Sequence, residues 1–433
     1  SEMPDLHAII QVNTFKLLYA ADEKITNARE HLNELFGRKY PNVFTPDMID
    51  YYEDSADELA IINYTSGTSG FSKGVMIPYR AIFSNIQFAQ KVLPDLDNTK
   101  SIVSMLPSAH MYGLMFELLY ELTVGAHVHF LSRVPSPKII MRAMAEVKPY
   151  LVIAVPLVIE KISTSKVKPI LEKEGVRMLI KLPVLSQLVL NKIREELVNA
   201  FGGEFYQVII GGAAFNKEEE AFFKKIGFPV TVGYGMTECA PIITYDDWNV
   251  GKLYSCGKIA PNMEMKIDSV DPVNVPGEIL IKGANVFLGY FKNEEATKAV
   301  FTKDGWFRTG DMGVVDKDGC LFIKGRSKCM ILGPSGQNIY PEEVETVINN
   351  QLYVVDSLVI EDNGGLTALI YPDFPQGAKD GMQQPEFVKY IKEMLPEWNK
   401  ELPNYAKLKK IKVMFEDFER TPKKSIKRYL YQR

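Results

Sequence analysis

The residues with the clearest capacity for chemistry lie in a short segment rich in glycine and hydroxyl side chains, Thr65-Ser-Gly-Thr-Ser-Gly-Phe-Ser-Lys-Gly74. Glycines let the backbone approach an anion closely. Backbone N–H groups and hydroxyls donate to phosphate oxygens, and Lys73 adds a positive charge. The segment is therefore a candidate phosphate loop, although an ordinary Ser/Gly turn has the same composition. Its candidate ligands are Thr65, Ser66, Gly67, Thr68, Ser69, Gly70 and Lys73.

The elements expected around this loop suit a phosphate site. The apolar run Leu59–Tyr64 predicts a short strand before it, and a helix is expected from about Tyr79. A Walker A loop needs Gly-Lys-Ser/Thr, whereas here Ser72 precedes the lysine and Gly74 follows it. The ordinary P-loop NTPases are therefore excluded.

Glycines and carboxylates recur in later segments. In Val208-Ile-Ile-Gly-Gly-Ala-Ala214 a predicted strand ends in two glycines, where backbone can pack against a flat base. Tyr234-Gly-Met-Thr-Glu238 ends in a carboxylate, a ligand type that Mg²⁺ prefers. Gly305-Trp-Phe-Arg-Thr-Gly-Asp311 places a second carboxylate after a predicted strand, and Lys324-Gly-Arg326 adds an arginine. Each charged residue taken alone would be an ordinary surface group, so the inference rests on their combination.

The segment from Tyr64 to Gly74 closely resembles the phosphate-loop signature of the adenylate-forming superfamily. That superfamily includes acyl-CoA synthetases, the adenylation domains of peptide synthetases and luciferases. The later segments resemble further landmarks of the family in the same order, so the resemblance runs from roughly Ala60 to the C-terminus. The sequence of residues 306–313 and 325–345 is most similar to that of long-chain fatty acyl-CoA synthetases.

The resemblance implies roles for individual residues. The ring of Tyr234 would stack on adenine, Thr237 would touch the α-phosphate, and Glu238 would hold Mg²⁺. Asp311 would accept both ribose hydroxyls, and Arg326 would also reach the ribose. Further nucleotide-binding positions implied in this way are Gly211, Gly212, Ala213 and Gly235. The implied catalytic residues are Lys73, Thr237, Glu238 and a lysine near the C-terminus.

That C-terminal lysine is ambiguous within Arg420-Thr-Pro-Lys-Lys-Ser-Ile-Lys-Arg428. Aligned without gaps to the long-chain pattern, Ser425 falls where the family has its lysine. A shift of one residue makes Lys424 the catalytic residue, while Lys427 lies on the other side. A basic, solvated tail without a catalytic role is the alternative.

The resemblance also predicts the domain organisation. Strands alternating with helices before residue 255 indicate an α/β domain, and the Gly- and Pro-rich texture after it indicates a β-rich section. We expect a large domain over residues 1–327 and a small, mobile α+β domain over 328–433. Lys328 matches the family's hinge, and Gly336 matches a glycine that lines the thiol tunnel. Only 64 residues precede Thr65, which is short for the family, so the large domain is expected to be incomplete at its N-terminus.

The acyl site is predicted at Pro107-Ser-Ala-His-Met-Tyr-Gly113, which resembles the family's acyl-site motif. His110 would lie near the carboxylate or the acyl chain, although a lone histidine is more often structural. The apolar run Leu114–Leu122 is equally compatible with a helix of the core.

Composition limits the remaining possibilities. The net charge of −4 argues against a nucleic-acid binder. The four cysteines lack metal-site spacing and form no disulfide framework, which favours reduced thiols in a cytoplasmic protein. His127 and His129 are better explained by alternation on a strand than by zinc. No signal peptide is recognised, and no apolar run reaches about 20 residues, the length of a membrane span.

Peripheral contact with a membrane is a further expectation, for the stretch between Lys161 and Arg194. Its basic residues include Lys166, Lys168, Lys173, Arg177, Lys181 and Lys192. Its apolar residues include Leu179, Ile180, Leu182, Val184, Leu185, Leu188 and Leu190. A basic amphipathic stretch can lie on an anionic bilayer, but a helix packed on the core with lysines outward has the same pattern.

The expected activity is that of a fatty acid–CoA ligase using ATP, Mg²⁺ and coenzyme A. A carboxylate and ATP would give acyl-AMP and pyrophosphate, and the acyl group would then pass to coenzyme A. One alternative is an acyl-AMP ligase that loads a carrier protein or uses another acid. The other is an inactive relative that binds nucleotide or acyl-CoA. The sequence fixes neither the acyl chain length nor the oligomeric state.

Overall fold

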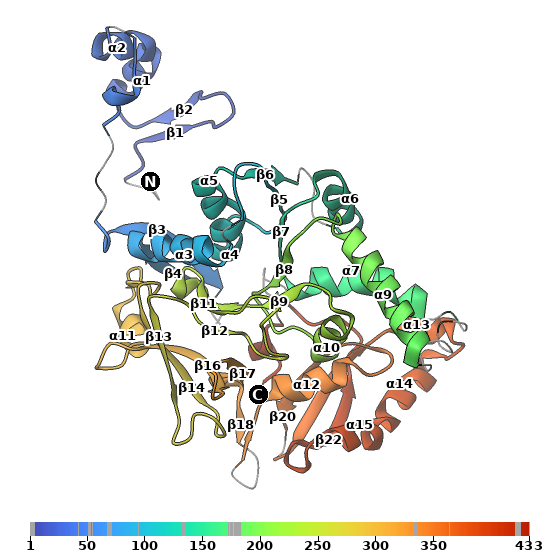
Figure 1. Cartoon of the computed structure of the whole chain (residues 1–433). Helices are drawn as coiled ribbons and strands as arrows, with labels where there is room; N and C mark the ends of the chain where they lie inside the picture. Colours follow the sequence, from blue (N-terminus) through green and yellow to red (C-terminus); the bar gives the residue numbers. More distant parts are fainter. Residues whose placement is uncertain are drawn as a thin grey trace. The chain divides into compact units, whose positions relative to one another are not determined.

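The chain forms two compact units, Ser1–Ser55 and Ala56–Arg433, in the computed structural model shown in Figure 1. The structure describes all residues except 1–4, 42, 51–52, 54, 67–71, 94, 132–135, 172, 174–175, 177–182, 333–336, 363, 421–425 and 433. The side chains at positions 66, 168 and 183–185 are also left out of the description.

The first unit pairs an antiparallel hairpin with two short helices. The strands are β1 (Ala8–Ile10) and β2 (Leu17–Ala20). Two helices follow, α1 (Glu23–Glu30) and α2 (Leu32–Lys39), with a break at His31. A short 3₁₀ turn, η1 (Pro46–Met48), follows.

A five-stranded parallel sheet forms the centre of the second unit, in the order β6-β5-β7-β8-β9. Side chains of successive residues point to opposite faces of a strand. On β7, Ile153 belongs to one buried apolar cluster, while Val152 and Ala154 belong to another. The sheet is therefore covered on both faces, which confirms the predicted α/β class. The strands are β5 (Ser101–Ser104), β6 (His127–Phe130), β7 (Leu151–Ala154), β8 (Gln207–Ile210) and β9 (Val230–Val232).

Helices connect these strands and supply the two apolar clusters. The connection after β7 enters a helix directly at Pro156. Proline suits the first turn of a helix, where its missing N–H has no helical partner. The helices are α4 (Met111–Leu114), the π-helix η2 (Met115–Leu119), α5 (Tyr120–Val124), α6 (Pro137–Val147), α7 (Pro156–Leu171), α9 (Pro183–Ala200) and α10 (Lys217–Ile226).

The candidate phosphate loop belongs to a β-hairpin, which corrects the expected strand–loop–helix order. Strand β3 (Leu59–Ser66) precedes the loop and β4 (Ser72–Pro78) follows it, before helix α3 begins at Tyr79 and ends at Val92. β4 also pairs with the two-residue strand β15 (Gly289–Tyr290), more than two hundred positions along the chain. β4 was missed because the Ser-Lys-Gly at its start has the composition of a loop.

The β-rich section consists of two antiparallel sheets. One has the order β10-β11-β12 and the other β13-β14-β16-β17. Asp311 lies inside β16 and not after a strand, which corrects the prediction from sequence. The strands are β10 (Tyr234–Gly235), β11 (Ile242–Tyr245), β12 (Lys258–Ile259), β13 (Met263–Asp268), β14 (Gly277–Gly283), β16 (Phe307–Val315) and β17 (Leu321–Arg326). The 3₁₀ turn η3 (Thr237–Cys239) and helix α11 (Glu294–Ala299) lie between strands.

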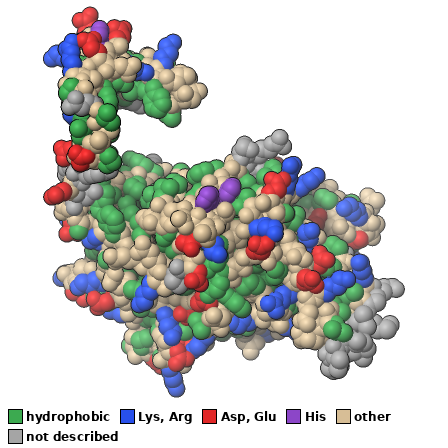
Figure 2. All heavy atoms as spheres, turned by 45° about the horizontal axis from the view of Figure 1, so that its top comes forward, with side chains coloured by type: hydrophobic (Ala, Val, Ile, Leu, Met, Phe, Trp, Pro, Cys, Tyr) green, Lys and Arg blue, Asp and Glu red, His purple; other side chains and the backbone are tan. Residues whose placement is uncertain are grey.

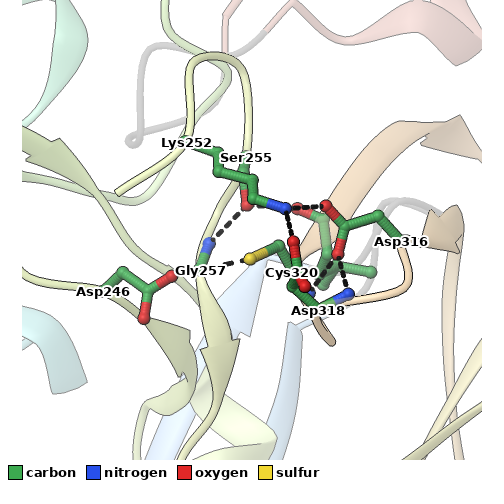
Figure 3. A network of polar contacts seen from close by, with 8 residues as sticks. Asp246, Lys252, Ser255, Gly257, Asp316, Asp318 and Cys320 are labelled. Carbon is green, nitrogen blue, oxygen red and sulfur yellow. Dashed lines mark hydrogen bonds and ion pairs between the residues drawn. The ribbon is translucent and has the colours of Figure 1, made fainter. Parts of the chain in front are cut away.

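A polar network joins these two sheets (Figure 3). The ammonium of Lys252, in the loop between β11 and β12, donates to Asp316 at 2.6 Å and also contacts Asp318. Asp316 in turn accepts from the backbone N–H of Cys320 at 2.9 Å, closing the turn between β16 and β17. The network fixes the β16–β17 hairpin against the sheet that begins at Tyr234.

The C-terminal part is α+β, as predicted. β20 (Val354–Glu361), β21 (Leu366–Pro372) and β22 (Leu408–Val413) form a mixed sheet, in which the last pairing is parallel. Two helices of this part, over residues 384–393 and 395–401, divide at Met394. The helices are α12 (Pro341–Asn349), α13 (Phe374–Lys379), α14 (Gln384–Glu393) and α15 (Leu395–Glu401). Short elements are η4 (Ser327–Cys329), β18 (Ile331–Leu332), β19 (Asn338–Ile339), η5 (Asn404–Ala406) and η6 (Arg428–Leu430). The boundary expected at 327/328 stays a prediction.

The charge distribution and the state of the cysteines agree with the composition. On the face shown in Figure 2, acidic and basic side chains are interspersed, in line with 50 basic and 54 acidic residues. The four cysteines are free thiols. Within the described part of the chain, no group of three or more His, Cys, Asp or Glu side chains is arranged to hold a metal. In the same part, no helix has the length and apolar character needed to cross a membrane.

Candidate functional site

The first group in the candidate site is a chain of three polar side chains. The hydroxyl of Tyr234 donates to Oδ2 of Asp311 at 2.6 Å, and Nε of Arg326 lies 3.1 Å from Oδ1 of the same carboxylate. Asp311 is buried, whereas half of the Arg326 side chain is exposed. Burial and the neighbouring Asp311 raise the pKa of Tyr234 well above its usual value, so this hydroxyl keeps its proton and acts as a donor.

Strand register explains how these residues meet. Asp311 and Arg326 are direct partners across the antiparallel pair β16–β17. Side chains of directly opposed residues lie on the same face of a sheet. The N–H of Asp311 is also held by the hydroxyl of Thr309 at 3.1 Å. Both oxygens of the Asp311 carboxylate are therefore engaged by neighbours that fix its direction.

The second group joins the β3–β4 hairpin, which carries the candidate phosphate loop, to the end of the Tyr234–Glu238 segment. The hydroxyl of Tyr290 donates to Oε1 of Glu238 at 3.0 Å. The ammonium of Lys73 lies over the ring of the same tyrosine, 4.5 Å from its centroid. Thr65 is the strand partner of Lys73 in the hairpin, so both lie at the mouth of the candidate loop.

A tight turn connects the two groups. Tyr234 and Gly235 form β10, and Glu238 follows four residues after Tyr234 in the turn η3. A Cβ atom at Gly235 would lie 2.2 Å from the carbonyl oxygen of Pro241, so only glycine fits there. Asn85 fixes this turn from α3, donating to Cys239 O at 3.2 Å and accepting from Ile242 N at 3.1 Å. Asn85 is fully buried and was not predicted from sequence.

The third group lies at the C-terminal edge of the parallel sheet. His110 occupies the N-cap position of α4, and the preceding carbonyl of Ala109 accepts from the side chain of Asn63 at 2.8 Å. Tyr112 packs on the backbone after β8, where a Cβ atom at Gly211 would lie 3.1 Å from its ring. Gly211 therefore allows the Tyr112 ring to approach the backbone closely, and contact of this glycine with a base stays a prediction.

Glu117 stabilises the same edge of the parallel sheet through hydrogen bonds. Its buried carboxylate accepts from Ser104 Oγ at 3.1 Å, Met105 N at 3.2 Å and Leu106 N at 2.9 Å. It lies in the π-helix η2, a helical form that is rare and often found at functional sites. Burial raises the pKa of Glu117 to about 7, against the opposing effect of these donors. Glu117 thus ties the end of β5 to the helix that carries His110.

Comparison with known proteins places the chain in a family. The model described as "AMP-binding enzyme" matches residues 7–291, and the model described as "AMP-binding enzyme C-terminal domain" matches residues 330–433. The chain belongs to the AMP-binding enzyme family. This membership confirms the resemblance drawn from the motifs.

Relatives of this AMP-binding enzyme include two long-chain-fatty-acid–CoA ligases. The protein named ACSBG2 from Homo sapiens is 26% identical over 345 residues, which are 75% of this chain and 51% of the relative. Ligase 1 from Saccharomyces cerevisiae is 31% identical over 342 residues, 72% of this chain and 48% of the relative. The chain spans about half the length of these two relatives.

A solved structure shows the same fold. The O-succinylbenzoate coenzyme A synthetase from Bacillus subtilis, in complex with ATP and magnesium ion, superimposes with a TM-score of 0.69 at 24% identity. The match covers 93% of this chain and 76% of that one.

The donor set of the AMP-binding enzyme fits a magnesium nucleotide. Mg²⁺ is usually held by one or two carboxylates together with substrate phosphates, so a single carboxylate at Glu238 is sufficient. Its Oε1 accepts from the Tyr290 hydroxyl, and the Lys73 ammonium lies over the ring of the same tyrosine. A carboxylate for the metal and an ammonium for the phosphates are groups that a metal-bound triphosphate requires.

Most of the residues predicted from sequence can be located. The structure brings Lys73 and Glu238 together through Tyr290, and Tyr234, Asp311 and Arg326 by direct contact. Thr237 is buried beside them, and Gly212 and Ala213 are exposed after β8. Ser66 lies in β3, but its side chain is not described. The remaining predicted residues lie outside the described part of the chain: Gly67, Thr68, Ser69, Gly70, Gly336 and Lys424.

Proposed function

We propose that this chain activates a carboxylic acid with ATP, forming acyl-AMP and pyrophosphate, and then transfers the acyl group to coenzyme A. One observation carries the proposal. The ribose-side residues Tyr234, Asp311 and Arg326 and the phosphate-side residues Lys73 and Glu238 meet at the two ends of a single five-residue turn. A nucleotide lying along that turn would reach both groups at once.

The charges at the site suit this reaction. A carboxylate attacks a highly anionic nucleotide poorly unless the negative charge is offset. Lys73, the backbone donors of the loop and a Mg²⁺ held by Glu238 would offset that charge as pyrophosphate leaves. Thr237 would contact the α-phosphate, which receives the attack. No side chain has to form a covalent bond, because orientation and electrostatics can lower the barrier.

The three residues on the ribose side of the site would orient the nucleotide. Asp311 would accept the ribose hydroxyls, since its carboxylate is fixed by Tyr234 and Arg326. Arg326 would reach the ribose from its exposed side. The ring of Tyr234, held by its own hydroxyl, would support adenine beside Gly235. The exposed backbone at Gly212 and Ala213 would complete this side of the site.

A long-chain fatty acid is the proposed substrate. The two relatives above are named for long-chain fatty acids, and the chain shares 26% and 31% of matched residues with them. His110 and the apolar surface of α4 and η2 would face the acid. The fold also accommodates other acids, because the Bacillus subtilis neighbour is named for O-succinylbenzoate. The acid therefore has to be identified by experiment.

The C-terminal part would serve the two steps in turn. Lys424 would stabilise the adenylation transition state, and rotation of residues 328–433 about Lys328 would then withdraw it. Gly336 would line the path of the thiol after that rotation. These assignments come from the family resemblance and remain proposals.

Pyrophosphate release tests the proposal. The chain is incubated with ATP, Mg²⁺ and a panel of acids that includes long-chain, short-chain and aromatic members, with and without coenzyme A. Release that depends on a long-chain acid, together with thioester formation from coenzyme A, is the expected result. Release without transfer to coenzyme A would favour a carrier protein as acceptor. No release with any acid, together with retained ATP binding, would indicate an inactive relative.

A further inference from the structure

Tyr290 contacts both charged residues on the phosphate side of the candidate site. Its hydroxyl donates to Oε1 of Glu238 at 3.0 Å, and its ring lies under the ammonium of Lys73 at 4.5 Å. The side chain is 7% exposed, so neither contact depends on a mobile surface group. No sequence motif singled this residue out.

Three contacts fix the backbone of the segment 287–290. Strand β15 pairs with β4, where Tyr290 is the partner of Val75, two residues after Lys73. The N–H of Tyr290 donates to the hydroxyl of Thr297 at 2.9 Å. Three residues earlier, the N–H of Phe287 donates to the carbonyl of Glu238 at 2.9 Å. The segment 287–290 therefore binds the backbone and the side chain of Glu238 together.

The position of the ring separates two opposite charges. A lysine and a glutamate that face one another at a site would ordinarily form a direct ion pair. Lys73 and Glu238 make no direct ion pair in the described structure, and each of them contacts Tyr290 instead. The phenol hydroxyl satisfies one carboxylate oxygen, and the ring face attracts the ammonium through a cation–π contact. The Lys73 ammonium and the Glu238 carboxylate can thus each interact with a bound ligand.

We propose that Tyr290 is a positioning residue that keeps Lys73 and Glu238 apart, so that one acts on phosphate and the other on the metal. The inference rests on the proposed function, in which a magnesium nucleotide binds here. Loss of the hydroxyl would free the Glu238 carboxylate to turn. Loss of the whole ring would let Lys73 and Glu238 pair directly, and each would cancel the charge of the other.

Two substitutions separate the two contacts. Tyr290→Phe keeps the ring under Lys73 and removes only the hydroxyl. Tyr290→Leu removes the ring as well. Tyr353→Phe is a matched control, because the Tyr353 hydroxyl also donates to a carboxylate, that of Asp380 at 2.7 Å, in the C-terminal part.

Metal–nucleotide binding is measured directly, with Mn²⁺ in place of Mg²⁺ and free Mn²⁺ quantified by electron paramagnetic resonance in the presence of ATP. Tyr290→Phe is expected to weaken Mn²⁺ binding about 10-fold, which is the effect of one hydrogen bond to a charged group. Tyr290→Leu is expected to weaken it more, and Tyr353→Phe is expected to match the wild type. In turnover, the Mg²⁺ concentration for half-maximal pyrophosphate release should rise in the same order, while thioester formation from supplied acyl-AMP stays within about twofold.

Wild-type Mn²⁺ binding by Tyr290→Phe would overturn the inference. If Glu238→Gln abolishes pyrophosphate release while Tyr290→Phe leaves both readouts unchanged, the proposed function stands and the role of Tyr290 fails. If the wild-type chain releases no pyrophosphate with any acid, the proposed function fails. The comparison of Mn²⁺ binding between Tyr290→Phe and the wild type still decides the inference in that case.

Discussion

The hydroxyl of Tyr234 donates a 2.6 Å hydrogen bond to the carboxylate of Asp311, although 77 positions separate the two residues. The contact joins two sheets of the β-rich section, which a polar network around Lys252 also holds together. Because Arg326 binds the other carboxylate oxygen, Asp311 has a fixed direction before any ligand arrives. A preoriented carboxylate suits recognition of paired hydroxyl groups.

Substitution of Asp311 should therefore affect nucleotide binding more than the later acyl transfer. Asp311→Asn is expected to raise the KM for ATP at least about 10-fold, because the amide replaces a charged acceptor and leaves Arg326 without its partner. Thioester formation from supplied acyl-AMP should change less. Asp268→Asn, at an exposed position of β13, is the control. An unchanged KM for ATP would remove Asp311 from the nucleotide site.

Glu238→Gln tests the metal side of the site. The amide retains the shape of the side chain but not its charge, so pyrophosphate release should fall by at least about 10²-fold if the carboxylate holds Mg²⁺. Added Mg²⁺ should restore only part of the activity. Release near the wild-type rate at ordinary Mg²⁺ would show that Glu238 takes no part in the reaction.

Local signals in the sequence were sufficient for much of the fold. Helix α12 begins at Pro341 with Glu342 and Glu343 in its first turn, as proline at the first position and acids near the helix N-terminus predict. The strands of the parallel sheet were also predictable, since each contains valine or isoleucine, which favour strands. Helix α3 also begins at Tyr79, where a helix was expected.

Contacts between distant segments were not predictable in this way. Strand β15 has only two residues, Gly289 and Tyr290, so it carries no periodic pattern, and its existence depends on pairing with β4. Asn85 and Glu117 occupy apolar helices, where their burial follows from partners in other elements. The residues of each motif were found because they form one continuous stretch of sequence. The residues that hold the motifs in place lie outside these stretches and were therefore missed.

The C-terminal lysines can be separated by half-reaction. The described residues on either side are anchored, since Arg420 pairs with Asp356 at 2.6 Å and Arg428 contacts the buried Glu345. If Lys424 is catalytic, Lys424→Ala should abolish adenylate formation and spare thioester formation from supplied acyl-AMP. Lys427 already pairs with the exposed Glu419 at 3.1 Å, so Lys427→Ala should change either step little. Full activity of both variants would show that this tail has no catalytic role.

Membrane contact is tested by sedimentation with vesicles. In helix α9, Leu190, Ile193 and Leu197 are buried in the core, while Leu188 is exposed. Much of the basic stretch before it, including Arg177 and Lys181, lies outside the described residues. We predict binding to anionic vesicles at low salt that fades toward ~1 M salt, where the Debye length falls to about 3 Å. Equal sedimentation with anionic and neutral vesicles at low salt would leave the stretch as part of an ordinary core helix.

Glu121 gives a prediction about stability and pH. Its side chain is fully buried in α5, and neither carboxylate oxygen has a hydrogen-bond partner among the described residues. Burial raises the pKa of this carboxyl from 4.5 to about 8, and the nearby Glu117 adds to the rise. The folded chain therefore keeps a proton that the unfolded chain releases near its ordinary pKa. Since the folded state binds more protons between these two values, its stability must fall as the pH rises through this window.

Glu121→Gln removes this dependence, because the amide resembles the protonated acid and never ionises. The variant is expected to unfold like the wild type at about pH 5 and to be more stable by on the order of 2 kcal/mol at about pH 9. Chemical denaturation at the two pH values measures the difference, with the exposed Glu146→Gln as control. The sign of the stability difference between Glu121→Gln and the wild type at the higher pH decides the question. If Glu121 were an ionised group that stabilised the fold, Glu121→Gln would lose stability at the higher pH, and this account of the buried carboxyl would be wrong.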